Sequence, residues 1–114
     1  MNIYHVWCNL KEPRRDLEFV ENLRGYMEYL IKSGDMESWR ITRRKLGFGP
    51  SELGEFHITM EFNSLVELER AFGDVATRTG EVEDLHRKVF MMVTDFRSGL
   101  TRDFPDPGRP LEHG

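Results

Sequence analysis

At 114 residues the chain has the length of one domain, and its composition, 39% hydrophobic and 32% charged, is ordinary for soluble globular proteins. The formal net charge of −4 argues against non-specific nucleic-acid binding, which requires a basic domain. No apolar run approaches the roughly 18 residues needed to cross a bilayer, so we expect neither a nucleic-acid partner nor a membrane span.

The first residues and the cysteine usage indicate a cytoplasmic protein. The start, "MNIYHVWCNL", has no basic region before its apolar segment, as a secretory signal would have. Cys8 is the one cysteine, which excludes an internal disulfide framework. We expect an inert, buried thiol at this position.

The first half of the chain predicts a strand, a helix and a second strand. Residues 3–10 are rich in β-branched and aromatic side chains, which is typical of a strand. From Asp16 the apolar residues recur at three- and four-residue spacing, which predicts a helix that stops at Gly34. A second strand is predicted over 37–46. The helical residues expected to face the core are Leu17, Val20, Leu23, Met27, Leu30 and Ile31.

The second half predicts a hairpin partner, two helices and a last strand. The glycine-rich loop 47–54 leads into an alternating strand over 55–63. Ser64 and Glu67 form a capping box, which predicts a helix start. Gly80 separates this helix from another over 81–93, with His86 at its rim, and a strand follows over 95–104. The apolar stripe expected on the first of these helices is Leu65, Leu68, Phe72, Val75 and Ala76.

This order, β-α-β-β-α-α-β, predicts an α+β protein with the ferredoxin-like fold. A helix between the first two strands permits a right-handed crossover that makes them parallel, and the loop 47–54 makes the next pair an antiparallel hairpin. We therefore expect a four-stranded antiparallel sheet with helices on one face. The domain is predicted to span 1–104, followed by a Pro/Gly-rich arm over 105–114.

Alternation in the strands divides the sheet into an apolar face and a polar face. Phe56, Ile58, Met60 and Phe62 are predicted to face the helices, which leaves their polar neighbours on the open face. If the loop joins its strands symmetrically, Arg44 lies opposite His57. Arg40 then lies opposite Glu61, close enough for an ion pair.

The open face also receives residues from the outer part of the chain. The first strand contributes His5, Trp7 and Asn9, and the last contributes Arg97 and Thr101. Such a face can be simply solvated, with ordinary charge pairs. Alternatively, two copies stack these faces and enclose a polar cavity. Trp7 favours enclosure, because exposed large apolar groups usually mark interfaces.

The polar face is the candidate ligand site. His57 is predicted to act as acid or base, because imidazole titrates near neutral pH. Arg40 and Arg44 can hold an anionic ligand through bidentate contacts, or can be occupied by pairing with Glu61 and Glu55. The remaining members of the predicted ligand-binding set are His5, Trp7, Asn9, Glu61 and Arg97.

Neither a metal nor a cofactor is predicted at this face. His5, His57 and Glu61 are residue types that bind transition metals, but the usual ligand-spacing signatures are absent. The loop 47–54 lacks the lysine and the hydroxyl residue of a phosphate-binding loop, so we interpret it as a hairpin connection.

Three stretches resemble a small bacterial family of uncharacterised single-domain proteins: "WRITRRKLGFGP" (39–50), "LGEFH" (53–57) and "RDFPDPGR" (102–109). The element order and polar face also look like the dimeric α+β barrel superfamily, which includes antibiotic-biosynthesis-type monooxygenases, haem-degrading enzymes and muconolactone-isomerase-like enzymes. The resemblance implies the fold and a homodimer, not a reaction. Asn9, Trp7 and His57 match the haem-degrading set in residue type only, since Asn9 and Trp7 share one strand.

Two classes of function follow from these predictions. In the first, the chain is a cofactor-independent enzyme, monooxygenase- or isomerase-like, acting on a small anionic or aromatic molecule. In the second, it is a non-catalytic small-molecule-binding or stress-responsive module that uses the same pocket. A cavity faced by an unpaired arginine or histidine favours the enzyme, and a cavity filled by its own ion pairs favours the module.

Overall fold

The computed structural model describes residues 1–76 and 80–105, and its element order is the predicted one. A short 3-10 helix, η1 (Pro13–Arg15), begins at the predicted proline and precedes the first long helix. The strands and long helices are β1 (Asn2–Leu10), α1 (Asp16–Lys32), β2 (Ser38–Arg43), β3 (Phe56–Phe62), α2 (Leu65–Ala76), α3 (Gly80–Phe90) and β4 (Val93–Arg102). All but the first residue of the predicted arm 105–114 lie outside the described residues.

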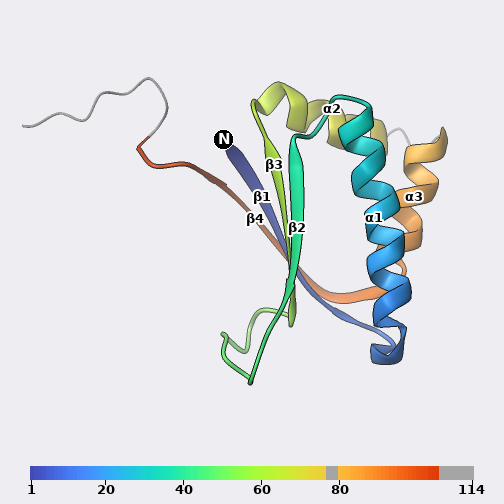
Figure 1. Cartoon of the computed structure of the whole chain (residues 1–114), viewed down its shortest axis with the longest axis vertical. Coiled ribbons are helices and arrows are strands. Elements are labelled where there is room, and N and C mark those ends of the chain that lie inside the picture. The colour runs from blue at the N-terminus through green and yellow to red at the C-terminus, as the bar shows by residue number, and fades with distance from the viewer. Residues whose placement is uncertain (77–79, 106–114) are drawn as a thin grey trace, which may run out of the picture.

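The four strands form one sheet in the order β2-β3-β1-β4, and every neighbouring pair is antiparallel. The helices all lie on one side of this sheet (Figure 1). The predicted ferredoxin-like α+β fold is therefore confirmed. One face of the sheet is covered by the chain's own helices, and the other face is open.

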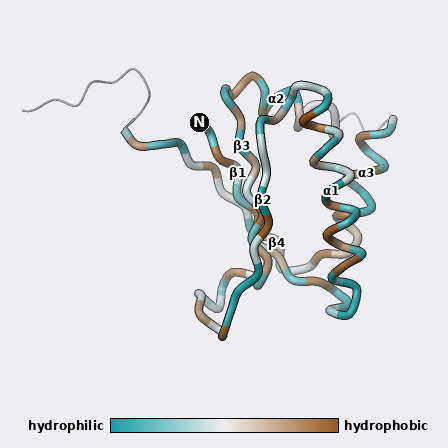
Figure 2. The backbone as a smooth tube through the Cα atoms, viewed as in Figure 1, coloured by the Kyte–Doolittle hydropathy of each residue, from teal (hydrophilic) through white to brown (hydrophobic). Residues whose placement is uncertain are grey.

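The predicted facing of β3 is also confirmed. Its four apolar side chains lie under the helices, with Ile58 only 3% exposed, while the residues between them are half-buried on the open face. Val6 and Cys8 of β1 join the same core, as do Trp39 and Ile41 of β2 at its edge. Figure 2 shows the hydrophobic residues of α1 on the side that faces the sheet.

The core-facing stripe of α1 differs from the predicted one. Leu17 is 77% exposed and Ile31 is 39% exposed. The buried residues follow one regular helical stripe instead, namely Phe19, Leu23, Tyr26, Met27 and Leu30. The helix stops where predicted, because Gly34 takes the left-handed conformation (φ 79°) and donates its N–H to the Ile31 carbonyl.

The predicted start of α2 is confirmed by its cap. The backbone N–H of Glu67 donates to Ser64 Oγ over 3.2 Å, and the Glu67 carboxylate accepts the N–H of Asn63. Ala71 is fully buried, while Leu65 of the predicted stripe is 43% exposed. The side chains of Val75 and Ala76 lie outside the described residues.

The last helix is shorter than predicted, and the last strand starts earlier. Helix α3 ends at Phe90, and Val93, predicted as helical, opens β4 opposite Leu10. A bulge in β4 between the partners of Trp7 and Asn9 then sets the side chains beyond it. As a result Arg97 and Thr101 lie on the open face, as predicted.

Candidate functional site

The predicted polar face exists, but the register of its hairpin differs by two residues from the symmetric one. Thr42 lies opposite His57, Arg40 opposite Thr59 and Ser38 opposite Glu61. The ladder ends where the backbone N–H of Arg44 donates to the Glu55 carbonyl over 2.7 Å. The hairpin loop is therefore longer than predicted and begins at residue 45.

This register overturns two predicted contacts. Glu61 accepts a hydrogen bond from Ser38 Oγ at 2.9 Å instead of pairing with Arg40, which is exposed and has no ionic partner among the described residues. Arg44 does not lie beside His57 as a free charge. Its Nη2 donates to the carbonyls of Pro50 (2.8 Å) and Leu53 (2.6 Å), so its guanidinium is bound within the loop.

Three aromatic side chains meet at the centre of the polar face. His5 and His57, predicted to share this face, are joined by a hydrogen bond of 2.9 Å between Nδ1 of His5 and Nε2 of His57. Trp7 stacks on His57 with ring centres 4.7 Å apart, and on His5 at 5.4 Å. The second nitrogen of His5 is 2.8 Å from Thr101 Oγ1, so the chain of polar contacts crosses from β3 through β1 to β4.

Burial lowers the pKa of His57 below its ordinary value, and the neighbouring His5 lowers it further. The charge of Arg44 is not a cause of this lowering, because its guanidinium is bound within the loop. His57 is held neutral at neutral pH by partial burial and by a second imidazole.

The two histidines are arranged for a hydrogen bond rather than for a shared metal. Their rings lie within 17° of one plane and 5.2 Å apart between centres, which is the head-on geometry of an N–H···N bond. The facing nitrogens are therefore already used. Within residues 1–76 and 80–105, no group of three or more His, Cys, Asp or Glu is placed to hold a metal ion.

The outer members of the predicted set have local partners. Asn9 accepts the backbone N–H of Glu55 at 2.9 Å and donates to Asp95 at 3.1 Å, so it ties β1 to the two strands beside it. Arg97 lies opposite Trp7 and donates to its neighbour's carbonyl, that of Phe96, at 3.0 Å. Glu55 itself pairs with Arg43, not with Arg44, at 3.3 Å.

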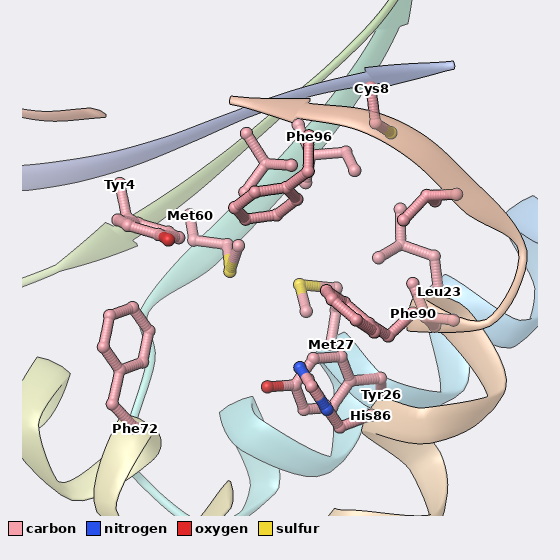
Figure 3. Close-up of a pocket in the computed structure, with 14 residues that line it drawn as sticks. Tyr4, Cys8, Leu23, Tyr26, Met27, Met60, Phe72, His86, Phe90 and Phe96 are labelled. Carbon is pink, nitrogen blue, oxygen red and sulfur yellow. The ribbon is translucent and has the colours of Figure 1, made fainter. Parts of the chain in front are cut away.

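A cavity that sequence reasoning missed lies on the opposite side of the sheet, under the helices (Figure 3). It has a volume of about 240 Å³ and lies between the sheet and helices α1, α2 and α3. Its lining residues are Tyr4, Val6, Cys8, Leu23, Tyr26, Met27, Ile58, Met60, Phe72, His86, Val89, Phe90, Val93 and Phe96. We call this cavity the helix-side pocket.

The polar groups of the helix-side pocket are few and converge. The hydroxyls of Tyr4 and Tyr26 point into it, and the His86 ring lies beside Tyr26 (Figure 3). Tyr26 and His86 meet edge to face with ring centres 5.7 Å apart, and His86 stacks on Phe90 at 5.5 Å. These contacts place one imidazole and two phenols against an otherwise apolar wall.

Burial sets the protonation of these groups. It lowers the pKa of His86 below its ordinary value, against the opposing pull of Glu83, and it raises the pKa of Tyr26. The pKa of the Cys8 thiol is raised to about 11, so the thiol is unreactive, as predicted. At neutral pH the pocket therefore contains a neutral His86 imidazole and a neutral Tyr26 hydroxyl.

The pocket was missed because its wall residues carry the same pattern as a filled core. Met27, Ile58 and Met60 are apolar at regular spacing whether or not a void lies between them. One available signal was the aromatic character of three wall residues: Phe72, Phe90 and Phe96 line the pocket and are each between 38% and 53% exposed. His86, predicted as a rim residue, is half-buried there.

The sequence profile of a family of unknown function (DUF6614) matches residues 1–113. The chain belongs to this family. Among solved structures, the DUF6614 chain resembles a protein from Deinococcus radiodurans named as a "putative antibiotic biosynthesis monooxygenase". The two share 16% sequence identity with a TM-score of 0.50 over 100% of this chain and 99% of the other, a likeness that shows the fold. A comparison with curated proteins finds no match.

The comparison supports the predicted fold. It carries no residue roles, because the identity is low. None of the helices in the described part of this DUF6614 chain is long and apolar enough to cross a membrane.

Proposed function

We propose that the helix-side pocket binds a small, uncharged, largely aromatic molecule and that His86 accepts a proton from it. One observation carries this proposal. The 14 residues around the pocket include no Asp, Glu, Lys or Arg, and their polar groups are concentrated in two tyrosines and one histidine. That is the usual composition of a small-molecule site, an apolar wall with a few converging polar groups.

The size and chemistry of the pocket define the ligand class. A volume of about 240 Å³ is slightly below the roughly 300 Å³ at which drug-sized sites begin, so a molecule with two fused rings would fill it. Phe72, Phe90 and Phe96 offer ring faces and edges for stacking. Among the described residues that line the pocket a charged ligand would find no ionic partner, which makes its burial costly, so the anionic alternative is not supported at this site.

His86 is the group best suited to chemistry. A neutral imidazole can accept a proton from a hydroxyl group on the ligand, and burial keeps His86 neutral at neutral pH. The name of the structural neighbour supports an enzymatic use of the same fold. We therefore favour a cofactor-independent, monooxygenase-like enzyme that acts on an aromatic hydroxyl compound.

One observation favours the alternative, a binding protein without catalysis. A general base is usually oriented by a third group, and in the described residues no hydrogen bond orients the His86 ring. The two functions share the ligand class and differ in whether His86 is needed for more than packing.

Binding can be tested with 2-naphthol, an uncharged fused-ring phenol whose fluorescence reports its surroundings. We expect saturable binding to the wild type and its loss in Val89→Phe, which places a ring in the pocket wall. The matched control is Val66→Phe on α2, outside the pocket and 61% exposed, which should bind normally. Equal binding by both variants would contradict the proposal.

The role of His86 can be tested by the pH dependence of the same binding. Protonation would place a charge beside the ligand, so wild-type affinity should fall as the pH drops below 6.5, the ordinary value for histidine. His86→Gln should bind with little pH dependence. If the affinity of the glutamine variant depended on pH as strongly as that of the wild type, His86 would be excluded as the proton acceptor.

We also propose that the polar face joins two copies in a homodimer. The supporting observation is the half-buried stack of His5, Trp7 and His57 at its centre, an aromatic patch unusual on a solvated sheet face. Light scattering at micromolar concentration should give twice the chain mass, and a monomer there would contradict this proposal.

A further inference from the structure

The connection between β2 and β3 (residues 44–55) is an ordered projection. We call it the arm; it is distinct from the predicted C-terminal segment 105–114. Hydrogen bonds from Arg44 Nη2 to the Pro50 and Leu53 carbonyls close it across its base. Backbone turns from Phe48 to Lys45 (3.0 Å) and from Leu53 to Pro50 (3.2 Å) shape its tip. The arm therefore has a fixed form despite extending past the end of the sheet (Figure 1).

Glycines adapt the arm to this form. A Cβ on Gly49 would lie 2.5 Å from Nε of Arg44, so the guanidinium can cross the loop only beside a residue without a side chain. Gly54 packs equally closely on the backbone of Cys8, which joins the arm to β1. A larger residue at Gly49 would displace the Arg44 side chain, and one at Gly54 would displace the backbone of Cys8.

The arm nevertheless presents two large apolar side chains to solvent. Leu46 is 89% exposed and Phe48 is 81% exposed, and Figure 2 shows hydrophobic residues toward the end of the arm. Leu46 also takes a left-handed backbone conformation (φ 55°), which is disfavoured for a leucine. A fixed loop that holds such side chains away from its own core is suited to contact another molecule.

The position of the arm indicates what kind of molecule it contacts. Phe48 and Pro50 border a recess that also contains Trp7 and His57, so the arm forms a rim of the polar face. At the other end of the sheet the chain that follows β4 runs away from the helices (Figure 1), and Phe104 there is 89% exposed. Whatever covers the polar face lies between these two projections.

The area of the face favours a second copy that also contacts the arms. Four strands spaced about 4.8 Å apart, overlapping over some six residues at about 3.3 Å each, present roughly 400 Å² in projection. Stable interfaces bury about 800 Å² per partner. A sheet-to-sheet contact of this size is modest for a stable interface, and the exposed Leu46 and Phe48 of the arms add apolar surface to bury.

From this geometry we infer that the arm packs against a second copy of the chain and that Leu46 and Phe48 become buried in this contact. The inference rests on the homodimer proposed above and adds the element that holds it. In a two-fold pair each copy contributes one arm, so the recess beside Trp7 and His57 is closed only when the second copy is present.

The test is the dissociation constant of the dimer, measured by sedimentation for the double variant Leu46→Ser/Phe48→Ser. We expect weakening on the order of 100-fold or more, because two large apolar side chains lose their burial. Leu17→Ser is the matched control, since Leu17 is 77% exposed on α1, on the helix side. It should leave the dissociation constant unchanged. Far-UV circular dichroism checks that the double variant is folded.

The outcomes separate the proposals. A wild-type dimer that the double variant leaves intact overturns the inference and assigns the arm to a different partner. A wild-type monomer overturns both the inference and the homodimer, but not the ligand proposal. Equal weakening by Leu17→Ser would also overturn it, because the loss would not then be specific to the arm.

Discussion

Ile58 shows how one residue separates the two sides of the sheet. It is 3% exposed and lines both the core and the helix-side pocket, while its neighbour Thr59 is half-buried on the polar face. Ile58→Ala should lower the free energy of unfolding by roughly 2–5 kcal/mol, because it removes buried methyl groups. Urea unfolding measures this, with Thr59→Ala as the control. A loss under about half a kcal/mol would show that Ile58 is not in the core.

His57 provides a second prediction at the residue scale. Its imidazole should titrate below 6.5 by NMR, and His5→Ala should raise the midpoint by removing the second cause of the shift. Arg44→Ala should leave the midpoint unchanged, because Arg44 is bound within the arm. A midpoint that shifts in Arg44→Ala but not in His5→Ala would contradict this arrangement. It would indicate that Arg44 lies beside His57, as expected from a symmetric hairpin.

The lowered pKa values of His57 and His86 also predict how stability depends on pH. Because the folded values lie below the ordinary 6.5, the unfolded chain binds protons first as the pH falls. This contribution to stability is complete above 6.5 and is lost as the pH falls from 6.5 toward the folded values. Urea midpoints at pH 7.5 and 5.5 should differ in that direction. The double variant His57→Gln/His86→Gln should show a smaller difference.

Among the elements, the arm depends most on a single side chain. Arg44→Ala removes the donor that satisfies the Pro50 and Leu53 carbonyls, so amide exchange over residues 48–54 should accelerate at least tenfold. Arg40→Ala is the matched control, since Arg40 has no ionic partner among the described residues. Equal exchange in both variants would show that the backbone turns alone hold the arm.

Elements with strong periodicity could be predicted from sequence, and their relative register could not. The alternation of Phe56, Ile58, Met60 and Phe62 determines which face is buried, because a one-residue slip would expose all four. A two-residue slip preserves every face, so alternation could not distinguish Thr42 from Arg44 as the partner of His57. The register is instead set by the loop, where the Arg44 side chain donates hydrogen bonds to the Pro50 and Leu53 carbonyls. The alternation pattern of the strands does not encode this contact.

The site divides in the same way. The grouping of His5, Trp7 and His57 follows from strand order and parity alone, and the structure confirms it. The helix-side pocket depends on how the helices pack on the sheet, where Phe72 contacts Tyr4 and Phe90 contacts Phe96. The spacing of apolar residues identifies which side chains face inward, but not whether those side chains contact one another or leave a cavity between them.

In the whole molecule, the two faces of one sheet have separate proposed roles. The helix side holds an uncharged pocket, and the open side holds the aromatic cluster and the arm that we assign to a second copy. The two proposals make independent demands, because Val89 and His86 line one site, whereas Phe48 borders the other and Leu46 lies near it on the arm. A variant in one site should therefore leave the other measurement unchanged.

The central claim, a ligand in the helix-side pocket, is tested most directly by methionine methyl NMR during titration with 2-naphthol. Met27 and Met60 line the pocket, whereas Met36 and Met91 do not. Ring currents from a bound naphthol should shift the Met27 and Met60 methyl signals saturably and leave those of Met36 and Met91 in place. Signals of Met27 and Met60 that do not move, at concentrations where 2-naphthol remains soluble, would contradict the claim.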